Sequence, residues 1–322
     1  MNTTAAARIG LIGCGRLAAL GYVPALRRAV GVELVAVADP DHRRRAEVVA
    51  AHGDLRAGRV MAFPSAAALL DTIAVDAVSL ATPAHLHVAD AARAVAAGVD
   101  VLVEKPPAEG LGGARALAAL EPAPWVGFNR RFDPGVRAVR DVVPPTGDLD
   151  LTLAISYRRR SWRAHVAHDD ALLDLGPHLV DQARWLTGAD VVSVTASVVT
   201  HERAALELHT TRGLVRVFAR ADGVHRECID LRDVDGHVVA RHLVGGPVGA
   251  VRGRVQRGPH PLVLSLTAQV EALGRALDGS VEADLGTALD GVAVMGALHA
   301  ARASVAAGGE DVTVPPDLTA PT

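Results

Sequence analysis

The chain has 322 residues, of which 50% are hydrophobic and 21% are charged, and its formal net charge is −3. This length predicts about two domains with separate buried cores, and the balanced charge argues against a nucleic-acid partner. Two cysteines are too few for a disulfide framework, and the apolar tracts are too short for a membrane partner. Only seven residues precede the first apolar run, so we expect no secretion signal and a cytoplasmic protein.

The first part of the chain, residues 8–129, alternates short β-branched runs with alanine-rich stretches, the pattern of a parallel sheet covered on both faces. Six strands are predicted, at Arg8–Gly13, Glu33–Ala38, Arg59–Ala62, Ala77–Ala81, Asp100–Val103 and Trp125–Phe128. Helices are predicted between them, at about Gly15–Val30, Asp41–His52, Ser65–Asp71, Ala84–Ala97 and Leu111–Leu120. We therefore expect a doubly wound α/β domain over residues 1–128.

The sequence changes after about Pro134, where longer segments alternate polar and apolar residues. They predict a mostly antiparallel open sheet with strands at Asp148–Tyr157, Asp190–Val199, Ala204–His209, Gly213–Ala219, Glu227–Leu231 and His237–Leu243. Helices expected to flank this sheet lie at Ala171–Leu186, Pro261–Leu277 and Gly286–Ala306. Residues 129–322 are thus predicted to form an α+β domain, with a long mobile loop at Gly245–Pro261.

Lys105 is the single lysine among 33 basic residues, the rest of which are arginines. Arginine replaces lysine as a solvated charge, but only lysine loses its proton when it is partly buried. On this count alone, a functional lysine and a chance survivor are about equally plausible. Asparagine is almost as scarce, and Asn129 is for that reason a second, weaker candidate.

A glycine-rich turn joins the first predicted strand to the first predicted helix, with Gly13, Gly15 and Ala18 in a G-x-G-x-x-A pattern. The glycines allow a tight turn and a close approach to a pyrophosphate, which the free N–H groups of the helix would bind. In this context the pattern predicts a dinucleotide-binding Rossmann domain rather than a simple turn. The expected cofactor contacts here are Gly13, Cys14, Gly15, Arg16 and Leu17. Cys14 lies where a thiol can be reactive, but we favour a small filler.

Asp39 ends the second predicted strand, 24 residues after Gly15. Its carboxylate can accept hydrogen bonds from the adenosine ribose and would repel a 2′-phosphate, which favours NAD over NADP. Arg43, Arg44 and Arg45 follow, and one of them holding a phosphate is the alternative to a solvated helix face.

Two further motifs stand at the carboxyl ends of the fourth and fifth predicted strands. In a wound parallel sheet these ends open at the same edge as the glycine turn, which brings Lys105 to the nicotinamide. A lysine there can polarise the oxygen of an alcohol or carbonyl. The expected cofactor contacts in these motifs are Ala81, Thr82, Pro83, His87, Glu104 and Lys105.

Asp174 and His178 lie four residues apart in the second half of the chain. On a helix they share one face, which suits a carboxylate and an imidazole that act on one hydroxyl group. Pro177 lies between them, so the alternative is a helix that starts near Pro177, with Asp174 just outside it and His178 in the core.

Together these motifs resemble the glucose-fructose oxidoreductase, inositol dehydrogenase and rhizopine-catabolism (Gfo/Idh/MocA) family of two-domain nicotinamide oxidoreductases, over nearly the whole chain. The most specific motif is Glu104-Lys105-Pro106. The others are the glycine turn, Ala38-Asp39, Ala81-Thr82-Pro83 with His87, the stretch from Gly127 to Pro134, and Asp174 to His178 with Asp181 and Trp185.

The resemblance implies an NAD(P)-dependent dehydrogenase that acts on a CH–OH group of a sugar or cyclitol, with the cofactor bound non-covalently. It implies that His178 accepts the hydroxyl proton, that Lys105 polarises the reacting oxygen, and that Asp174 orients the imidazole or binds a neighbouring hydroxyl. The expected substrate contacts are Lys105, Asn129, Arg131, Tyr157, Arg163, His165, Asp174 and His178. It also implies a homodimer or homotetramer that forms through the exposed sheet of the second domain.

The chain departs from the family where Asp169-Asp170 replaces a common glycine pair. A metal site with His165 and His168 is conceivable there, but we favour surface pairing and expect no metal. Nucleotide-sugar ketoreductases of the family tend to carry tyrosine at the place of His178, so the histidine favours a free sugar or cyclitol. The alternatives are a nucleotide-sugar ketoreductase and a non-catalytic NAD-binding regulator.

Overall fold

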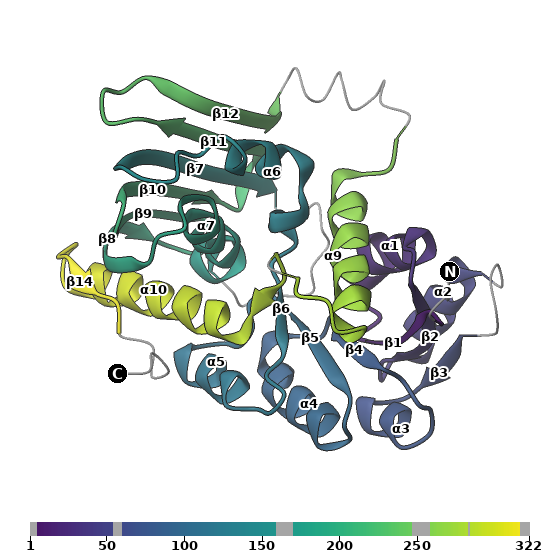
Figure 1. The fold of residues 1–322 in the computed structure, drawn as a ribbon. Coiled ribbons are helices and arrows are strands. Elements are labelled where there is room, and N and C mark those ends of the chain that lie inside the picture. Colours follow the sequence, from purple (N-terminus) through teal and green to yellow (C-terminus); the bar gives the residue numbers. More distant parts are fainter. Residues whose placement is uncertain (1–4, 54–59, 159–169, 247–257, 283, 316–322) are drawn as a thin grey trace. The chain divides into compact units, whose positions relative to one another are not determined.

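The structure is a computed structural model that describes residues 5–53, 60–158, 170–246, 258–282 and 284–315 (Figure 1). The chain forms two compact units. The first contains Met1–Asp133 and Pro259–Gly291, and the second contains Pro134–Gly258 and Val292–Thr322. Each unit is therefore built from two separate stretches of the chain.

A seven-stranded sheet forms the centre of the first unit, in the order β13-β6-β5-β4-β1-β2-β3. Six strands are parallel, as predicted, and a short strand from late in the chain, β13, adds an antiparallel edge. The strands are β1 (Ala7–Ile12), β2 (Val32–Ala38), β3 (Met61–Phe63), β4 (Ala77–Leu80), β5 (Asp100–Glu104), β6 (Trp125–Gly127) and β13 (Gly286–Thr287). The third strand was predicted to begin at Arg59, which lies outside the described residues.

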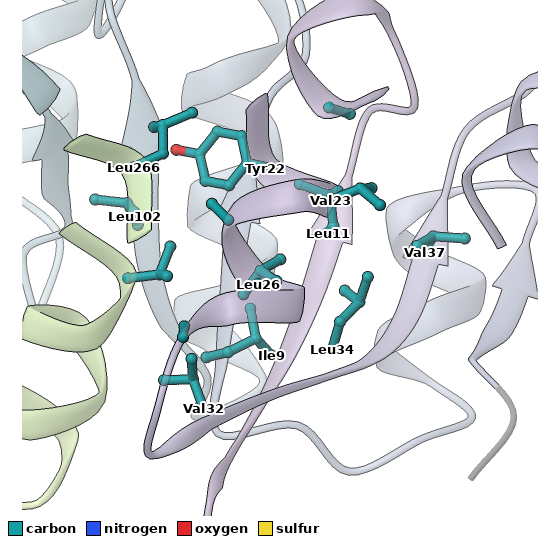
Figure 2. Close-up of a cluster of buried hydrophobic side chains, with 14 of the residues drawn as sticks. Ile9, Leu11, Tyr22, Val23, Leu26, Val32, Leu34, Val37, Leu102 and Leu266 are labelled. Carbon is teal, nitrogen blue, oxygen red and sulfur yellow. The ribbon is translucent and has the colours of Figure 1, made fainter. Parts of the chain in front are cut away.

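Each face of this sheet has its own apolar core, which confirms the doubly wound prediction. On one face, Ile9 and Leu11 of β1 pack with Tyr22 and Leu26 (Figure 2). On the other face, strand residues such as Leu80 pack with the helices that follow β3, β4 and β5. The helices of this unit are α1 (Val23–Arg28), α2 (His42–His52), α3 (Ala66–Leu70), α4 (Ala84–Ala96), α5 (Leu111–Ala118) and α9 (Pro261–Leu277). A π-helical turn (Ala18–Tyr22) precedes α1.

Helix α9 corrects one prediction, because it belongs to the first unit and packs in the core of the first sheet. Its buried residues Leu266, Val270 and Leu273 join the same core as Ile9 and Tyr22. A β-carbon on Gly21 would lie 2.6 Å from Leu266, so the two helices approach closely. The periodicity of α9 shows that one face is apolar, but it carries no information about which sheet that face covers.

The second unit contains a mostly antiparallel seven-stranded sheet in the order β12-β11-β7-β10-β9-β8-β14. Within it, β7 and β10 pair in parallel, whereas the other neighbours are antiparallel. The strands are β7 (Leu149–Arg158), β8 (Val191–Val199), β9 (Arg203–Thr210), β10 (Gly213–Arg220), β11 (Asp222–Arg232), β12 (Val238–Gly245) and β14 (Val312–Thr313).

Alternate residues of β7, such as Leu151 and Leu153, are buried on one face of this sheet, so the open α+β arrangement is confirmed. The helices are α6 (Pro134–Arg140), α7 (Ala171–Thr187) and, from Val292 onward, α10 (Ala288–Ala306). Residues 247–257 of the predicted loop lie outside the described residues. None of the helices in the described ranges is long and apolar enough to cross a bilayer.

Candidate active site

The glycine turn after β1 has the geometry of an anion cradle. Gly13 has a φ of 96°, and a β-carbon there would lie 2.6 Å from the carbonyl oxygen of Ala81. Only glycine allows this close approach between the turn and the end of β4. A β-carbon on Gly15 would meet nothing within 4 Å, so its absence leaves open space at the start of the helix. The cradle therefore fits a pyrophosphate that the backbone N–H groups would bind.

Asp39 fixes the shape of this turn from the end of β2. Its buried carboxylate accepts hydrogen bonds from the N–H groups of Cys14 and Asp41, each at 2.8 Å. A carboxylate has about four acceptor sites, so two backbone bonds leave capacity for ribose hydroxyls. Arg45 donates to the carbonyl of Asp39, and Arg44 lies 3.6 Å from the carboxylate of Asp41. The local arginines are thus partly engaged by the same loop.

Cys14 is buried in this turn. Burial, and next the charge of Asp39, raise the pKa of its thiol to about 12. The thiol is therefore neutral near pH 7, and a thiol in this form is a poor nucleophile. This supports the interpretation of Cys14 as a packing residue beside a cofactor.

The carboxyl ends of β4 and β5 lie on neighbouring strands of the same sheet. The Thr82 hydroxyl oxygen is buried there and has no hydrogen-bond partner in the described part of the chain. A buried hydroxyl without a partner is costly, and a bound cofactor group would supply one. Thr82 thus fits its predicted role.

His87, a predicted cofactor contact, lies between backbone carbonyls of two segments. It is buried, with Nε2 2.8 Å from the carbonyl oxygen of Thr82 and Nδ1 3.1 Å and 3.2 Å from those of Pro106 and Pro107. Burial lowers its pKa. Both ring nitrogens thus face backbone, so the imidazole links the segment after β4 to the segment after β5. This geometry favours a supporting role over direct contact with the cofactor.

Glu104 and Lys105 differ in exposure although they are adjacent. Lys105 is half-buried, and its peptide bond to Pro106 is cis. Glu104 is buried, and its carboxylate accepts hydrogen bonds from the Tyr22 hydroxyl at 2.6 Å and from the N–H of Lys105 at 3.1 Å. Burial raises the pKa of Glu104. Tyr22 was not predicted as part of the site, and the only signal for it in the sequence is that the chain has just two tyrosines.

Asn129 and Arg131, predicted as substrate contacts, are both buried in the first unit. Asn129 donates to the Ser265 hydroxyl at 3.1 Å, and Arg131 lies 3.0 Å from Asp290. The guanidinium carbon of Arg131 also lies 5.4 Å from the centre of the Phe128 ring. These contacts tie the segment after β6 to α9 and to the start of α10, and they favour a supporting role.

In the second unit, α7 places Asp174 and His178 one turn apart in a single helix. The helix begins at Ala171, and Asp170 caps it by accepting from the N–H of Leu173 at 2.9 Å. The alternative in which the helix starts near Pro177 is therefore wrong. Pro177 lies inside α7, where it cannot donate to the carbonyl four residues earlier.

Tyr157, near the end of β7, donates a short hydrogen bond to the Asp174 carboxylate. Both side chains and that of His178 are partly exposed. Arg163, His165, His168 and Asp169 lie outside the described residues, whereas Asp170 serves as the cap and pairs with Arg302 at 2.6 Å. Lys105 is in the first unit, and Asp174 and His178 are in the second.

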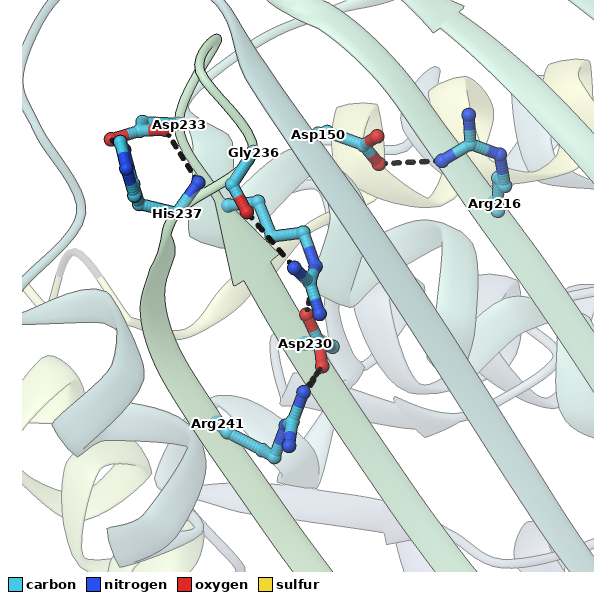
Figure 3. Close-up of polar contacts among 8 residues, drawn as sticks. Asp150, Arg216, Asp230, Asp233, Gly236, His237 and Arg241 are labelled. Carbon is cyan, nitrogen blue, oxygen red and sulfur yellow. Dashed lines mark hydrogen bonds and ion pairs between the residues drawn. The ribbon is translucent and has the colours of Figure 1, made fainter.

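Among the described residues, one group has metal-ligand composition: Asp233, Asp235 and His237, in the β11–β12 turn. Figure 3 shows Asp233 and His237 of this group. Asp233 accepts from the N–H groups of Asp235 and His237, at 3.0 Å and 2.9 Å. These bonds explain the cluster as an ordinary turn.

Comparison with known proteins gives two family matches. Residues 7–123 match the model of an oxidoreductase family with an NAD-binding Rossmann fold, and residues 147–225 match the GFO/IDH/MocA C-terminal domain.

Individual relatives agree with these matches. Inositol 2-dehydrogenase of Ralstonia nicotianae is 33% identical over 192 residues, which is 58% of this chain and 56% of that protein. The chain thus spans little more than half the length of this relative. The rhizopine catabolism protein MocA of Rhizobium meliloti is 30% identical over 245 residues, 72% of this chain and 70% of that protein.

A solved structure shows that the fold is shared. Myo-inositol dehydrogenase from Lactobacillus casei, in complex with NAD(H) and myo-inositol, superposes with a TM-score of 0.75. The match covers 98% of both chains at 20% sequence identity.

Proposed function

The chain belongs to the Gfo/Idh/MocA family of NAD-binding oxidoreductases, and from this premise we propose that it is a dehydrogenase of a free sugar or cyclitol. It transfers a hydride reversibly between nicotinamide and a secondary alcohol carbon. The relatives named inositol 2-dehydrogenase support a cyclitol substrate.

One observation carries this proposal: the single lysine of the chain follows β5 at the sheet edge where the glycine turn follows β1. In the sheet order, β4 alone separates β5 from β1. A nucleotide bound at the turn extends along this edge. The one side chain that can exchange a proton as an amine therefore lies where the nicotinamide is expected.

NAD would be held by the N–H groups of the turn, by the Asp39 carboxylate at the ribose and by the Thr82 hydroxyl. The unfilled space at Gly15 and the unpartnered Thr82 oxygen support this fit. The cofactor supplies the hydride chemistry. NADP is the alternative, and the Asp39 carboxylate disfavours it by charge repulsion.

The protein's own part is proton transfer and orientation. As the C–H hydride leaves the alcohol, His178, together with Lys105, takes the O–H proton, and a ketone forms. Asp174, held by Tyr157, orients the imidazole or binds a neighbouring hydroxyl. The shared helical face of Asp174 and His178 supports these roles.

The test is absorbance of reduced nicotinamide, with NAD or NADP and a panel of inositols and aldoses, for the parent and for Lys105→Arg. Lys105→Arg keeps the positive charge but cannot release a proton. We expect a polyol to reduce NAD, and kcat to fall about 10³-fold in the variant with the Kd for NAD within about threefold. Tight NAD binding without turnover of any polyol would contradict the proposal and favour a nucleotide-sugar ketoreductase or a regulator.

We also propose a homodimer or homotetramer that forms through the open face of the second sheet. One residue from each of six strands forms an apolar row across this face: Leu243, Cys228, Ala154, Phe218, Ala205 and Val198. Phe218 is 44% exposed and Leu243 is 54% exposed. A contiguous apolar row of this kind is typical of an interface.

Charged residues border the apolar row. Arg241 pairs with Asp230, and Arg216 lies 2.6 Å from Asp150 (Figure 3). Light scattering after gel filtration tests the interface: Phe218→Arg should convert the parent oligomer to a monomer, and a monomeric parent would contradict it.

The proposed cytoplasmic location rests on the sequence alone.

A further inference from the structure

The buried surroundings of Glu104 are not explained by cofactor binding. Three polar side chains from distant parts of the sequence meet there: Tyr22 from the π-helical turn, Glu104 from the end of β5, and Gln269 from α9. Tyr22 and Gln269 have no exposed surface, and Glu104 is 5% exposed. Buried polar groups of this kind are expensive unless they bond to one another.

The hydrogen bonds of this cluster run in one direction. Gln269 Nε2 donates to the Tyr22 hydroxyl at 3.4 Å, and that hydroxyl donates to Glu104 Oε1 at 2.6 Å. The other carboxylate oxygen, Oε2, accepts from the backbone N–H of Lys105 at 3.1 Å. Both oxygens of the Glu104 carboxylate thus accept a hydrogen bond, and such bonds favour the ionised form of the carboxylate.

This arrangement acts on Lys105 in two ways. The bond to its N–H fixes the backbone from which the lysine side chain starts. His87 fixes the same segment from the other side, through the carbonyls of Pro106 and Pro107. In addition, the buried carboxylate of Glu104 interacts electrostatically with the single lysine of the chain, and charges interact strongly in a region of low dielectric.

We propose that Glu104 is a positioning residue and buried counter-charge for Lys105, and that Tyr22 and Gln269 hold it in that role. The inference deepens the proposed function, because it assigns a task to a residue that does not touch the substrate. Burial raises the pKa of Glu104, while the Tyr22 hydroxyl and the charge of Lys105 lower it.

The composition of the chain allows a direct test. Reductive methylation with ¹³C-formaldehyde labels the N-terminal amine and one lysine, so the Lys105 resonance can be followed by NMR as the pH changes. Its absence from Lys105→Arg identifies it. In Glu104→Gln we expect the resonance to titrate at a pH lower by on the order of one unit, because the counter-charge is lost.

Two further variants keep the test decisive if Glu104→Gln does not fold. Tyr22→Phe removes one donor to the carboxylate but leaves its charge, so we expect kcat to fall while the Lys105 resonance titrates as in the parent. Ser79→Ala is the matched control, because it removes a fully buried hydroxyl of the same unit that has no hydrogen-bond partner among the residues the structure describes. An unchanged titration in folded Glu104→Gln would overturn the proposal, and where that variant is unfolded, an unchanged kcat in Tyr22→Phe would do so.

Kinetics give an independent readout. We expect kcat to fall about 100-fold in Glu104→Gln, about tenfold in Tyr22→Phe, and no further in the double variant than in Glu104→Gln alone, because the residues act as a unit. Losses that multiply would overturn the proposed coupling. The titration needs no substrate, so a shift without turnover would refute the proposed function alone, whereas turnover without a shift would refute this inference alone.

Discussion

The two tyrosines of the chain form the same contact in two different settings. Tyr22 donates to Glu104 in the first unit, where both side chains are buried. Tyr157 donates to Asp174 in the second unit, where both are partly exposed. Tyr22 and Glu104, the sealed pair, can affect only the residues that are bonded to them or packed against them. Tyr157 and Asp174, the open pair, leave a carboxylate within reach of a ligand. Exposure therefore separates a supporting pair from a reacting pair when the hydrogen bond is the same.

The largest expected effect is on the open pair. Asp174→Asn removes the charge that the proposed mechanism needs beside the imidazole, and we expect kcat to fall about 10³-fold. The free energy of unfolding should change by less than about 1 kcal/mol, because the site is partly exposed. Steady-state kinetics and urea unfolding measure both quantities. A large loss of stability with little change in kcat would reverse the roles of the two pairs.

The second effect compares the tyrosines by stability. Tyr22→Phe leaves a buried carboxylate without a donor, and we expect the free energy of unfolding to fall by about 2 kcal/mol. Tyr157→Phe should lower it by less than about 0.5 kcal/mol, since water can replace the lost hydroxyl. Urea unfolding of the two variants side by side decides the question. Equal losses would mean that burial does not distinguish the pairs.

A third, smaller effect concerns the activity of the open pair. Tyr157→Phe should lower kcat about tenfold and leave the Kd for NAD unchanged, because Tyr157 holds only Asp174 in the second unit. Combining it with Asp174→Asn should add little to the loss from Asp174→Asn. A change in Kd for NAD as large as the change in kcat would place Tyr157 in cofactor binding instead.

The smallest effect is a pH dependence of stability. Burial raises the pKa of Glu104 above its ordinary 4.5, so the folded chain keeps this proton at a pH where the unfolded chain has released it. The free energy of unfolding should therefore fall as the pH rises from about 4.5 to the raised pKa, by at most about 1.4 kcal/mol per pH unit.

Glu104→Gln should remove that slope, and urea unfolding of parent and variant at several pH values measures the difference. Burial lowers the pKa of His87 from 6.5, which has the opposite effect on how the free energy of unfolding changes with pH. Because His87 is present in both the parent and the variant, its contribution cancels in the difference between them. Parallel pH curves would show that Glu104 titrates alike in the folded and unfolded chains.

Much of the fold could be predicted from local patterns. The alternation of β-branched runs with helices gave the six parallel strands, and Gly13 with Asp39 marked the turn that joins them, because each of these signals is short-range. The place of α9 could not be predicted. Its apolar face is visible in the sequence, but the choice between two sheets depends on shape complementarity at residues such as Gly21 and Leu266.

The candidate site shows the same division. Lys105, Asp174 and His178 were predicted because of their residue types and spacing. His87 and Glu104 were assigned to cofactor contact because they belong to the same motifs, yet their polar atoms bond to protein groups. Direction and burial of a side chain depend on contacts with distant residues such as Tyr22, and one sequence does not contain that information.

The return of α9 to the first unit also bears on how the chain is made. Synthesis proceeds from the N-terminus, and domains generally fold as units while the chain grows. The first unit lacks one wall of its core until Pro259–Gly291 has left the ribosome. Residues 134–258 of the second unit are translated before that moment, so a nascent chain must wait with one face of the nucleotide-binding sheet only partly covered.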